Sequence, residues 1–270
     1  MEKFKRRFKS FLLIVAFLFI NVVIDAAAGA GTVILIVKLK GDLADIKDTV
    51  YGLLAAQIVK FVILYIYINI KNRKSAEPFI KDEKIKNPLL ISGIGVGVAG
   101  FGLLFTNCIV AAFKGSEVVM DAIDSLEKVL AADTIWGQAV VLFVTIIGAP
   151  IVEELLFRGF LFEKLTKYVS TKSCIILTAI VFAYYHFNIV QTANTFFIGL
   201  VLAYVYYKTR SIKASILVHM TNNAIAMVPI FDQGLSAIGI AIYLIFLITG
   251  IYSLRTLRQA DKEYLTGRTA

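Results

Sequence analysis

The stretch IWGQAVVLFVTIIGAPIVEELLFRGFLFE, residues 135–163, decides the fold. It is apolar and long enough to cross the hydrocarbon core of a bilayer as a helix, which takes about 20 residues. Yet it carries two adjacent carboxylates, Glu153 and Glu154, with Arg158 one helical turn later. Ionisable groups at such depth cost at least a few kcal/mol each and usually serve a function. The stretch therefore predicts a polar site inside a bundle of membrane-spanning helices.

The composition of the whole chain fits that interpretation. Of the 270 residues, 59% are hydrophobic and 17% are charged, whereas about a quarter of a soluble domain is charged. We expect an all-α, polytopic membrane helix bundle that forms a single integral membrane domain over residues 1–270. About eight transmembrane helices are predicted, at 11–37, 49–70, 89–113, 135–163, 173–190, 194–207, 213–230 and 235–254.

Basic residues predict how this bundle lies in the cell membrane. Lys and Arg are concentrated before the first predicted span and after the second, fourth, sixth and last, while the other loops carry much of the acid. By the positive-inside rule, both termini are expected in the cytoplasm. The net charge of +9 is then explained by orientation signals and by contacts with anionic lipid headgroups. No nucleic-acid partner is expected.

The first span permits a second interpretation. Its basic start, its apolar run and the small residues AAAGA at 26–30 also fit a signal peptide with a cleavage site. The apolar sequence resumes at once with TVILIV, which favours an uncleaved span. Asp25 in this span and Lys60 in the second fall near mid-membrane, where we expect a structural ion pair or polar contact rather than catalysis.

The acidic pair follows Pro150, which frees a backbone carbonyl and is expected to kink the helix. Glu154 and Arg158 stand at the i, i+4 spacing of an intrahelical ion pair. Glu153 points about 100° away around the helix, which leaves it free to project into a cavity. Taken alone, the same segment also fits a helix that merely ends in charged residues at the membrane interface.

Both histidines of the chain fall in predicted spans. His186 follows Phe182 by four residues, so the ring of Phe182 can pack beside the imidazole. His219 precedes Asn223 by four residues, again on one face of a helix, and Asn222 lies on the adjacent face. A lone intramembrane His is commonly a structural residue, but two of them with an acidic pair favour one shared site. We expect all these groups to converge on a pocket open toward the cytoplasm.

Three short motifs carry a resemblance to a known family. EELLFR (153–158), FAYYH (182–186) and HMTNN (219–223) resemble the EExxxR, FxxxH and HxxxN motifs of the CPBP family. That family comprises type II CAAX prenyl endopeptidases and the bacterial bacteriocin-processing and self-immunity proteins, also called Abi proteins. The motifs occur in the family order within a core at 135–230. The resemblance implies an intramembrane endopeptidase, glutamate-dependent or metal-dependent, with eight helices.

The resemblance also implies a role for each motif residue. Glu153 with His186 would activate the attacking water as general base, and His219 with Asn223 would stabilise the oxyanion of the tetrahedral intermediate. The remaining charged members of EExxxR would orient the site. The catalytic candidates are therefore Glu153, Glu154, Arg158, His186, His219 and Asn223.

A bound metal is the open alternative to a water activated by protein groups alone. In that case Glu153, His186 and His219 would bind Zn²⁺ and lower the pKa of its water. The chain contains no HExxH motif, so a zincin metalloprotease is not supported. We favour activation by Glu153 and His186 over a permanent zinc site.

Three classes of function remain open. The first is proteolysis of a membrane-associated peptide or protein, either of CAAX type or a bacteriocin or pheromone precursor. The second is a non-hydrolytic role in bacteriocin immunity or in modulating a membrane partner such as a sensor kinase. The third is transport or proton relay. Intact motif residues favour the first over the second, and the paired discontinuous helices of many transporters are not evident.

Overall fold

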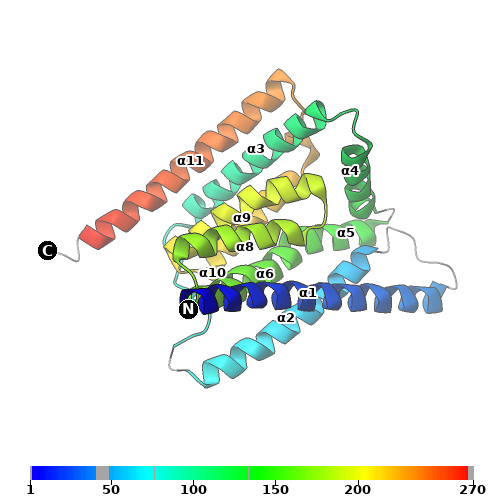
Figure 1. The fold of residues 1–270 in the computed structure, drawn as a ribbon. Helices are drawn as coiled ribbons and strands as arrows, with labels where there is room; N and C mark the ends of the chain where they lie inside the picture. Colours follow the sequence, from blue (N-terminus) through cyan, green and yellow to red (C-terminus); the bar gives the residue numbers. More distant parts are fainter. Residues whose placement is uncertain (1, 41–48, 76, 133, 267–270) are drawn as a thin grey trace.

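A computed structural model describes residues 2–40, 49–75, 77–132 and 134–266 (Figure 1). Within these ranges the chain is a helix bundle, which confirms the all-α prediction. The elements are α1 (Glu2–Lys40), α2 (Thr49–Arg73), α3 (Pro88–Ala112), α4 (Glu117–Leu130), α5 (Ile135–Phe143), the π-helical η2 (Val144–Gly148), α6 (Ala149–Glu154), the π-helical η3 (Leu155–Phe162), α7 (Glu163–Leu165), α8 (Thr171–Tyr185), α9 (Ile189–Thr209), α10 (Ile212–Ala226), the 3-10 turn η4 (Pro229–Phe231) and α11 (Ala237–Thr266).

Each predicted span coincides with a helix, but the helices differ in length. Among the described residues, six helical segments are long and apolar enough to cross a membrane, as in a multi-pass membrane protein. They are α1, α2, α3, the continuous run from α5 to α7, α9 and α11. The helices α8 and α10 have 15 residues each, fewer than a full crossing takes. The count of eight transmembrane helices stays a prediction.

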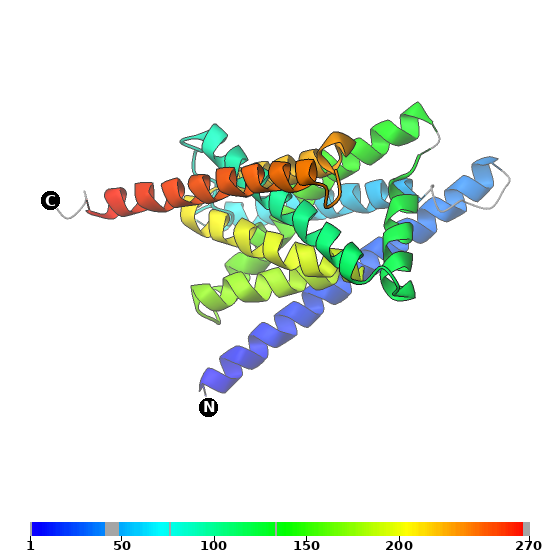
Figure 2. The ribbon, with the colours of Figure 1, turned by 90° about the horizontal axis from the view of Figure 1, so that it is seen from above.

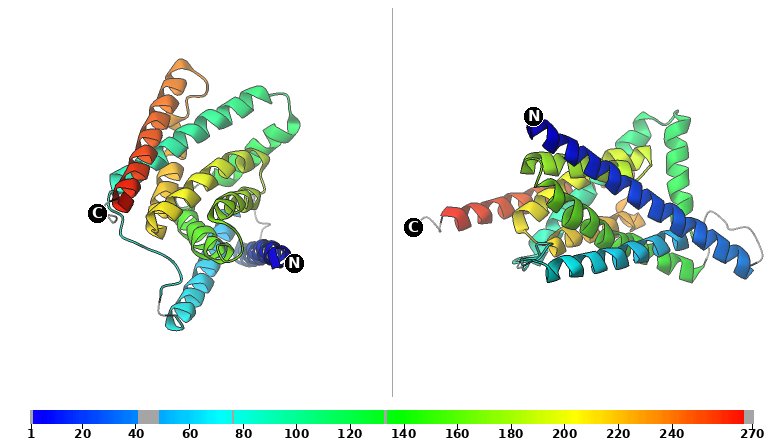
Figure 3. Two further views of the ribbon diagram at one scale, coloured as in Figure 1. Left: turned by 60° about the vertical axis from the view of Figure 1, so that its left-hand side comes forward. Right: turned by 60° about the horizontal axis from the view of Figure 1, so that its bottom comes forward.

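The helices are arranged in three groups. In Figure 1 the α1–α2 pair lies at the bottom, α3 and α11 lie at the top, and α6, α8, α9 and α10 lie between them. The left view of Figure 3 shows the same order from another side. The residues with fully buried polar side chains come largely from the middle group, so the core of the bundle contains the polar site that the sequence predicts.

The segments rich in basic residues gather at one side of the bundle. The N-terminus, the α2–α3, α7–α8 and α9–α10 connections and the C-terminus all lie at the left of Figure 1. The α2–α3 connection is fixed there by backbone hydrogen bonds from Glu83 N to Arg210 O (2.8 Å) and from Ile212 N to Lys81 O (3.2 Å). The charge pattern of the loops predicts that these basic segments share one side of the bundle.

A helix that was not among the predicted spans lies at the opposite side of the bundle. The segment between the third and fourth predicted spans forms α4, which lies across the direction of the long helices (Figures 1 and 2). Val119 is its buried residue, whereas Asp121, Asp124 and Glu127 are exposed. The side-chain amide of Asn188 donates to Ala122 O at 2.7 Å. This bond ties α4 to the turn between α8 and α9.

The α1–α2 pair is joined to the middle group by a polar cluster. Lys60, whose side chain is fully buried, forms an ion pair with Asp25 and a hydrogen bond with the hydroxyl of Tyr185. The same hydroxyl donates to Asp25 Oδ2 at 2.7 Å. The structural ion pair expected between Asp25 and Lys60 is therefore confirmed, and it extends to α8.

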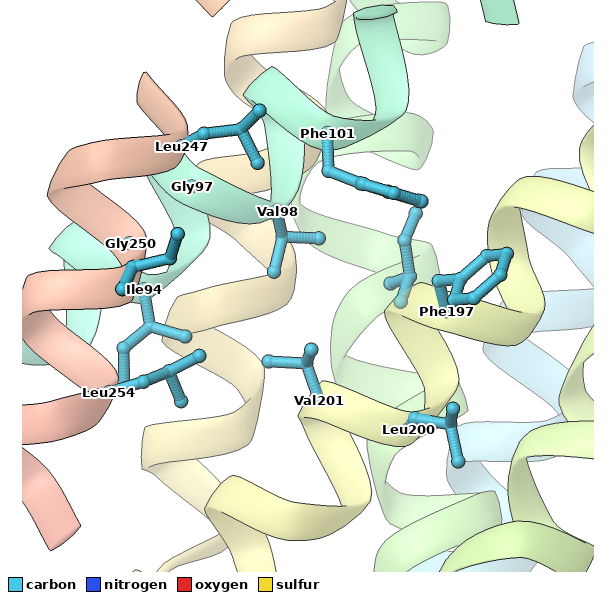
Figure 4. Close-up of a pocket in the computed structure, with 12 residues that line it drawn as sticks. Ile94, Gly97, Val98, Phe101, Phe197, Leu200, Val201, Leu247, Gly250 and Leu254 are labelled. Atoms are coloured by element: carbon cyan, nitrogen blue, oxygen red, sulfur yellow. The ribbon is translucent and has the colours of Figure 1, made fainter. Parts of the chain in front are cut away.

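On the other side of the bundle, α3 packs closely against α11. Gly97 and Gly250 face one another, and a Cβ atom on either would overlap the partner backbone, as is common where membrane helices cross closely. Beside this crossing, an apolar groove of about 230 Å³ runs between α3, α9 and α11 (Figure 4). Its walls are formed by aliphatic and phenylalanine side chains, so it offers no group for acid–base chemistry.

Candidate active site

The helix that carries the acidic pair alternates between α and π geometry. The π-helical segments η2 and η3 lie immediately before and after α6. The backbone N–H of Ala149 bonds to Val144 O, five residues earlier. Pro150 has no N–H to continue that series. A π-helical segment thus precedes Pro150, and the kink expected there stays a prediction. Such π-helical segments are rare, and many of those known lie at functional sites.

Glu154 accepts three charged or polar donors. Its Oε1 lies 2.8 Å from Nη1 of Arg158 and 2.9 Å from Nδ1 of His219. Its Oε2 accepts a hydrogen bond from the hydroxyl of Ser215. The carboxylate is fully buried, and such burial is tolerated only when the charge is paired and hydrogen-bonded. The predicted Glu154–Arg158 ion pair is therefore present, and Glu154 also orients His219.

Arg158 connects three helices. Its Nη2 donates to the carbonyl of Gly199 in α9 at 3.0 Å, and its guanidinium carbon lies 4.7 Å from the ring centroid of Phe182 in α8. Gly199 packs tightly against Ala179, and a Cβ atom there would come within 3.0 Å of the Ala179 Cα. The Nε atom of Arg158 is buried and has no hydrogen-bond partner among the described residues. The guanidinium thus holds α8 and α9 against the helix of the acidic pair.

Glu153 stands apart from this network. Its Oε2 is buried without a hydrogen-bond partner in the described part of the chain, and the residue is 8% exposed. The nearest ionisable partner is His219, whose Nε2 lies 3.9 Å from that oxygen. A gap of this size is too long for a direct hydrogen bond. Glu153 is therefore the unpaired carboxylate of the site, as its place on the helix predicts.

Hydrogen bonds indicate the tautomer of each imidazole. Nδ1 of His219 faces the carboxylate of Glu154, and Nδ1 of His186 lies 2.8 Å from the carbonyl of Phe182. Both of these oxygens act as acceptors, so each Nδ1 carries the hydrogen, and each neutral ring has its lone pair on Nε2. Nε2 of His219 is thus left as a hydrogen-bond acceptor beside Glu153.

The ring of Phe182 lies between the two imidazoles. Its centroid is 4.8 Å from that of His186 and 5.8 Å from that of His219, both in edge-to-face geometry. The packing expected for Phe182 and His186 is therefore confirmed. Both imidazoles therefore contact this ring, and His219 also bonds to Glu154. In the described contacts, however, the imidazole beside Glu153 belongs to His219, and His186 is joined to the group through Phe182.

The helix that bears His186 is shorter than the sequence predicts. A span at 173–190 was expected, but α8 ends at Tyr185 and His186 is its C-terminal cap. Phe187 adopts a left-handed backbone with φ of 49°, and the side chain of Asn188 caps the start of α9. A tight turn therefore follows His186, and the imidazole lies at a helix end instead of within a span.

Asn223 contacts the helix of the acidic pair through a backbone group. Its Nδ2 donates to the carbonyl of Thr145 at 2.8 Å, and its Oδ1 accepts a hydrogen bond from Nδ2 of Asn222, also at 2.8 Å. The oxyanion role implied for Asn223 stays a prediction. Ser215 and Thr145 were not identified from the sequence, although Ser215 precedes His219 by four residues and so shares its face.

The arrangement does not fit a preformed zinc site. Catalytic zinc is bound by three protein ligands. Within the ranges that the structure describes, no group of three or more His, Cys, Asp or Glu side chains is placed to hold a metal ion. Oε2 of Glu153 and Nε2 of His219 are two nearby atoms that could bind a metal. The oxygens of Glu154 are already hydrogen-bonded to His219 Nδ1 and to Ser215. We therefore derive no step through a metal.

The model of one protein family matches this part of the chain. The family is described as type II CAAX prenyl endopeptidase, Rce1-like, and the match covers residues 135–225. This region belongs to the Rce1-like family. It contains the three motifs at 153–158, 182–186 and 219–223, on α6 to η3, at the end of α8 and on α10. No curated protein and no solved structure matches the chain. The helices α1 to α4 and α11 lie outside the Rce1-like match.

Proposed function

We propose that this protein is an intramembrane endopeptidase that hydrolyses a peptide bond in a membrane-associated peptide or protein. The observation that carries the proposal is the gap of 3.9 Å between Oε2 of Glu153 and Nε2 of His219. Both atoms accept hydrogen bonds, and one water molecule can donate a hydrogen to each. The oxygen of such a water keeps its lone pairs directed away from both groups, available for attack on a carbonyl carbon.

The chemistry then follows from proton positions. Glu153 takes a proton from the water while the water oxygen bonds to the scissile carbonyl carbon. This step gives a tetrahedral intermediate. The protonated Glu153 delivers that proton to the leaving nitrogen as the C–N bond breaks. The second hydrogen of the water stays on its oxygen and remains donated to Nε2 of His219, which orients the hydroxyl during the attack. His186 offers a second Nε2 acceptor across Phe182, consistent with the role in water activation that the family resemblance implies.

The remaining motif residues act on the site indirectly. Glu154 fixes the tautomer and orientation of His219, and Arg158 neutralises Glu154 and joins it to α9. Because Glu154 is already neutralised by Arg158, Glu153 is left as the carboxylate available for proton transfer. The two glutamates therefore have different functions, which the pattern of their hydrogen bonds supports.

The test is product analysis with purified protein reconstituted in lipid vesicles. Membrane-anchored reporter peptides, one set ending in a CAAX sequence and one set built as bacteriocin or pheromone precursors, are incubated with wild type and Glu153→Gln. We expect cleavage by wild type, with one water-derived oxygen in the new carboxylate, and none by Glu153→Gln. The matched control, Glu127→Gln on the exposed face of α4, retains cleavage. Full biological function of Glu153→Gln would instead favour the non-hydrolytic immunity or partner-modulating role.

We also propose that the basic side of the bundle faces the cytoplasm, so that both termini are cytoplasmic and the site receives its substrate from that leaflet. The gathering of the basic connections at one side supports this orientation. Single cysteines placed at Lys167 and at Ser116 in a cysteine-free background report it. An impermeant thiol reagent added to intact cells should label position 116 and spare 167, and the reverse pattern would contradict the orientation.

A further inference from the structure

One carbonyl in the helix of the acidic pair loses its expected donor. In the π-helical register of η2, the N–H of Ala149 bonds to Val144 O. The next bond of that register would run from residue 150 to the carbonyl of Thr145. Residue 150 is Pro150, which has no N–H. The Thr145 carbonyl therefore needs a partner from outside the helix, since a carbonyl shielded from water is costly to leave without a donor.

Asn223 of α10 supplies that partner. Its Nδ2 lies 2.8 Å from Thr145 O. The direction of the amide is set by Asn222, whose Nδ2 donates to the Oδ1 of Asn223 and so turns the Nδ2 of Asn223 toward η2. The side-chain amide thus stands in the place of the backbone N–H that Pro150 lacks.

The helix α10 contacts the helix of the acidic pair both before and after Pro150. Before the proline, Asn223 holds the Thr145 carbonyl; after it, His219 holds Glu154. Relaxation of a π-helical turn to α geometry removes one residue from the turn, which rotates the following segment by about 100° relative to the preceding one. Such a rotation would carry Glu153 away from Nε2 of His219. The bond to Thr145 opposes it.

We propose that Asn223 is a positioning residue that replaces the backbone donor missing at Pro150 and thereby keeps the η2 segment, and Glu153 beyond it, in register with His219. The activity readout rests on the proposed endopeptidase function, but the hydrogen bond itself does not. This assignment differs from a direct oxyanion contact, because a positioning residue can be replaced by any group that restores the donor to Thr145.

The chain allows a spectroscopic test that is independent of activity. Thr-Ile occurs at 134–135 and 145–146 in the sequence and nowhere else. Labelling Thr with ¹³C at the carbonyl and Ile with ¹⁵N therefore selects two carbonyl signals. Thr134 O, which accepts from the N–H of Gln138, is the internal reference. In Asn223→Ala, we expect the Thr145 signal to move upfield as its hydrogen bond is lost, while the Thr134 signal stays.

Activity then separates positioning from direct contact. Loss of the register between Glu153 and His219 should lower kcat of Asn223→Ala by about 10²-fold or more with little change in KM. Pro150→Ala introduces an N–H that can bond to Thr145 O, so Pro150→Ala/Asn223→Ala should recover both the Thr145 signal and most of kcat. An unmoved Thr145 signal in Asn223→Ala would overturn the proposal. So would a recovered signal without recovered kcat, because that result assigns Asn223 a contact with the substrate.

Discussion

Nδ1 of His219 lies 2.9 Å from Oε1 of Glu154, so Glu154 orients this imidazole. The other ring nitrogen, Nε2, faces Glu153. This relationship distinguishes the two members of the pair. Glu154 is hydrogen-bonded at both oxygens, and Glu153 has an oxygen without a partner among the described residues. The two glutamates should therefore respond differently to the same substitution.

Glu154→Gln should destabilise the protein, whereas Glu153→Gln should not. Removal of the Glu154 charge leaves the buried guanidinium of Arg158 uncompensated, and breaking a buried ion pair costs about 3–5 kcal/mol. Glu153 has no such partner, and its neutral variant removes a buried charge. Thermal unfolding in detergent measures both effects. Equal losses of Tm for the two variants would contradict the division of roles.

Arg158→Lys should not preserve the site, although it keeps the charge. The guanidinium contacts Glu154 and the Gly199 carbonyl with two separate nitrogens, and the single ammonium of Lys cannot reproduce that geometry or the stacking on Phe182. We expect a stability loss of about 1–3 kcal/mol from the bond to Gly199. The comparison of Arg158→Lys with wild type in a denaturation series checks this. Wild-type stability would show that charge alone is sufficient.

Ser215→Ala should weaken the site although Ser215 lies outside the three motifs. Its hydroxyl donates to Glu154 Oε2, and hydrogen bonds to charged groups contribute about 1.5–3 kcal/mol. Ser215→Thr retains the hydroxyl and serves as the control if its extra methyl is accommodated. Unfolding curves of the two variants test the contact, and indistinguishable curves for Ser215→Ala and wild type would argue against it.

The α1–α2 pair should depend on a balanced polar cluster. Lys60→Met leaves Asp25 without its cation, so the variant should be less stable than wild type. Lys60→Met/Asp25→Leu removes both charges and should recover stability, because a buried ion pair is often replaced by apolar residues at no cost. Protease resistance of the α1–α2 pair in vesicles measures the result. A double variant weaker than Lys60→Met would show that Asp25 has another role.

Chelators should leave catalysis unchanged under the proposed mechanism. A water held by Glu153 and His219 needs no metal, so treatment with a zinc chelator followed by dialysis should not lower the cleavage rate. Elemental analysis of the purified protein should find zinc well below one equivalent per chain. Inhibition that zinc alone reverses would favour the metal-dependent alternative, with Glu153, His186 and His219 as ligands.

The sequence was sufficient to predict which helices carry the candidate site, because ionisable residues in apolar segments are rare enough to stand out. The Glu154–Arg158 pair and the packing of Phe182 on His186 followed from the i, i+4 spacing. The neighbour of Glu153 did not, since which imidazole approaches a carboxylate depends on how α6 and α10 pack. The π-helical segments around α6 could not be predicted either, because no residue preference distinguishes them from an α-helix with a proline.

The ends of the helices near the candidate site could not be predicted from the sequence either. The apolar run through His186 predicted a longer span, and only the left-handed backbone at Phe187 shows why α8 stops. The helix α4 escaped because its charged residues suggested a loop. Its apolar residues recur with helical spacing, so the amphipathic pattern of this helix is nevertheless present in the sequence.

The most direct test of the shared water is a double-mutant cycle between Glu153 and His219. Single-turnover cleavage rates are measured for wild type, Glu153→Gln, His219→Gln and the double variant at matched protein abundance. If both groups act on one water, each substitution lowers the rate by about 10²–10⁴-fold, and the double variant is no slower than the worse single one. Losses that multiply would mean that the two residues act independently, and the central claim would then be wrong.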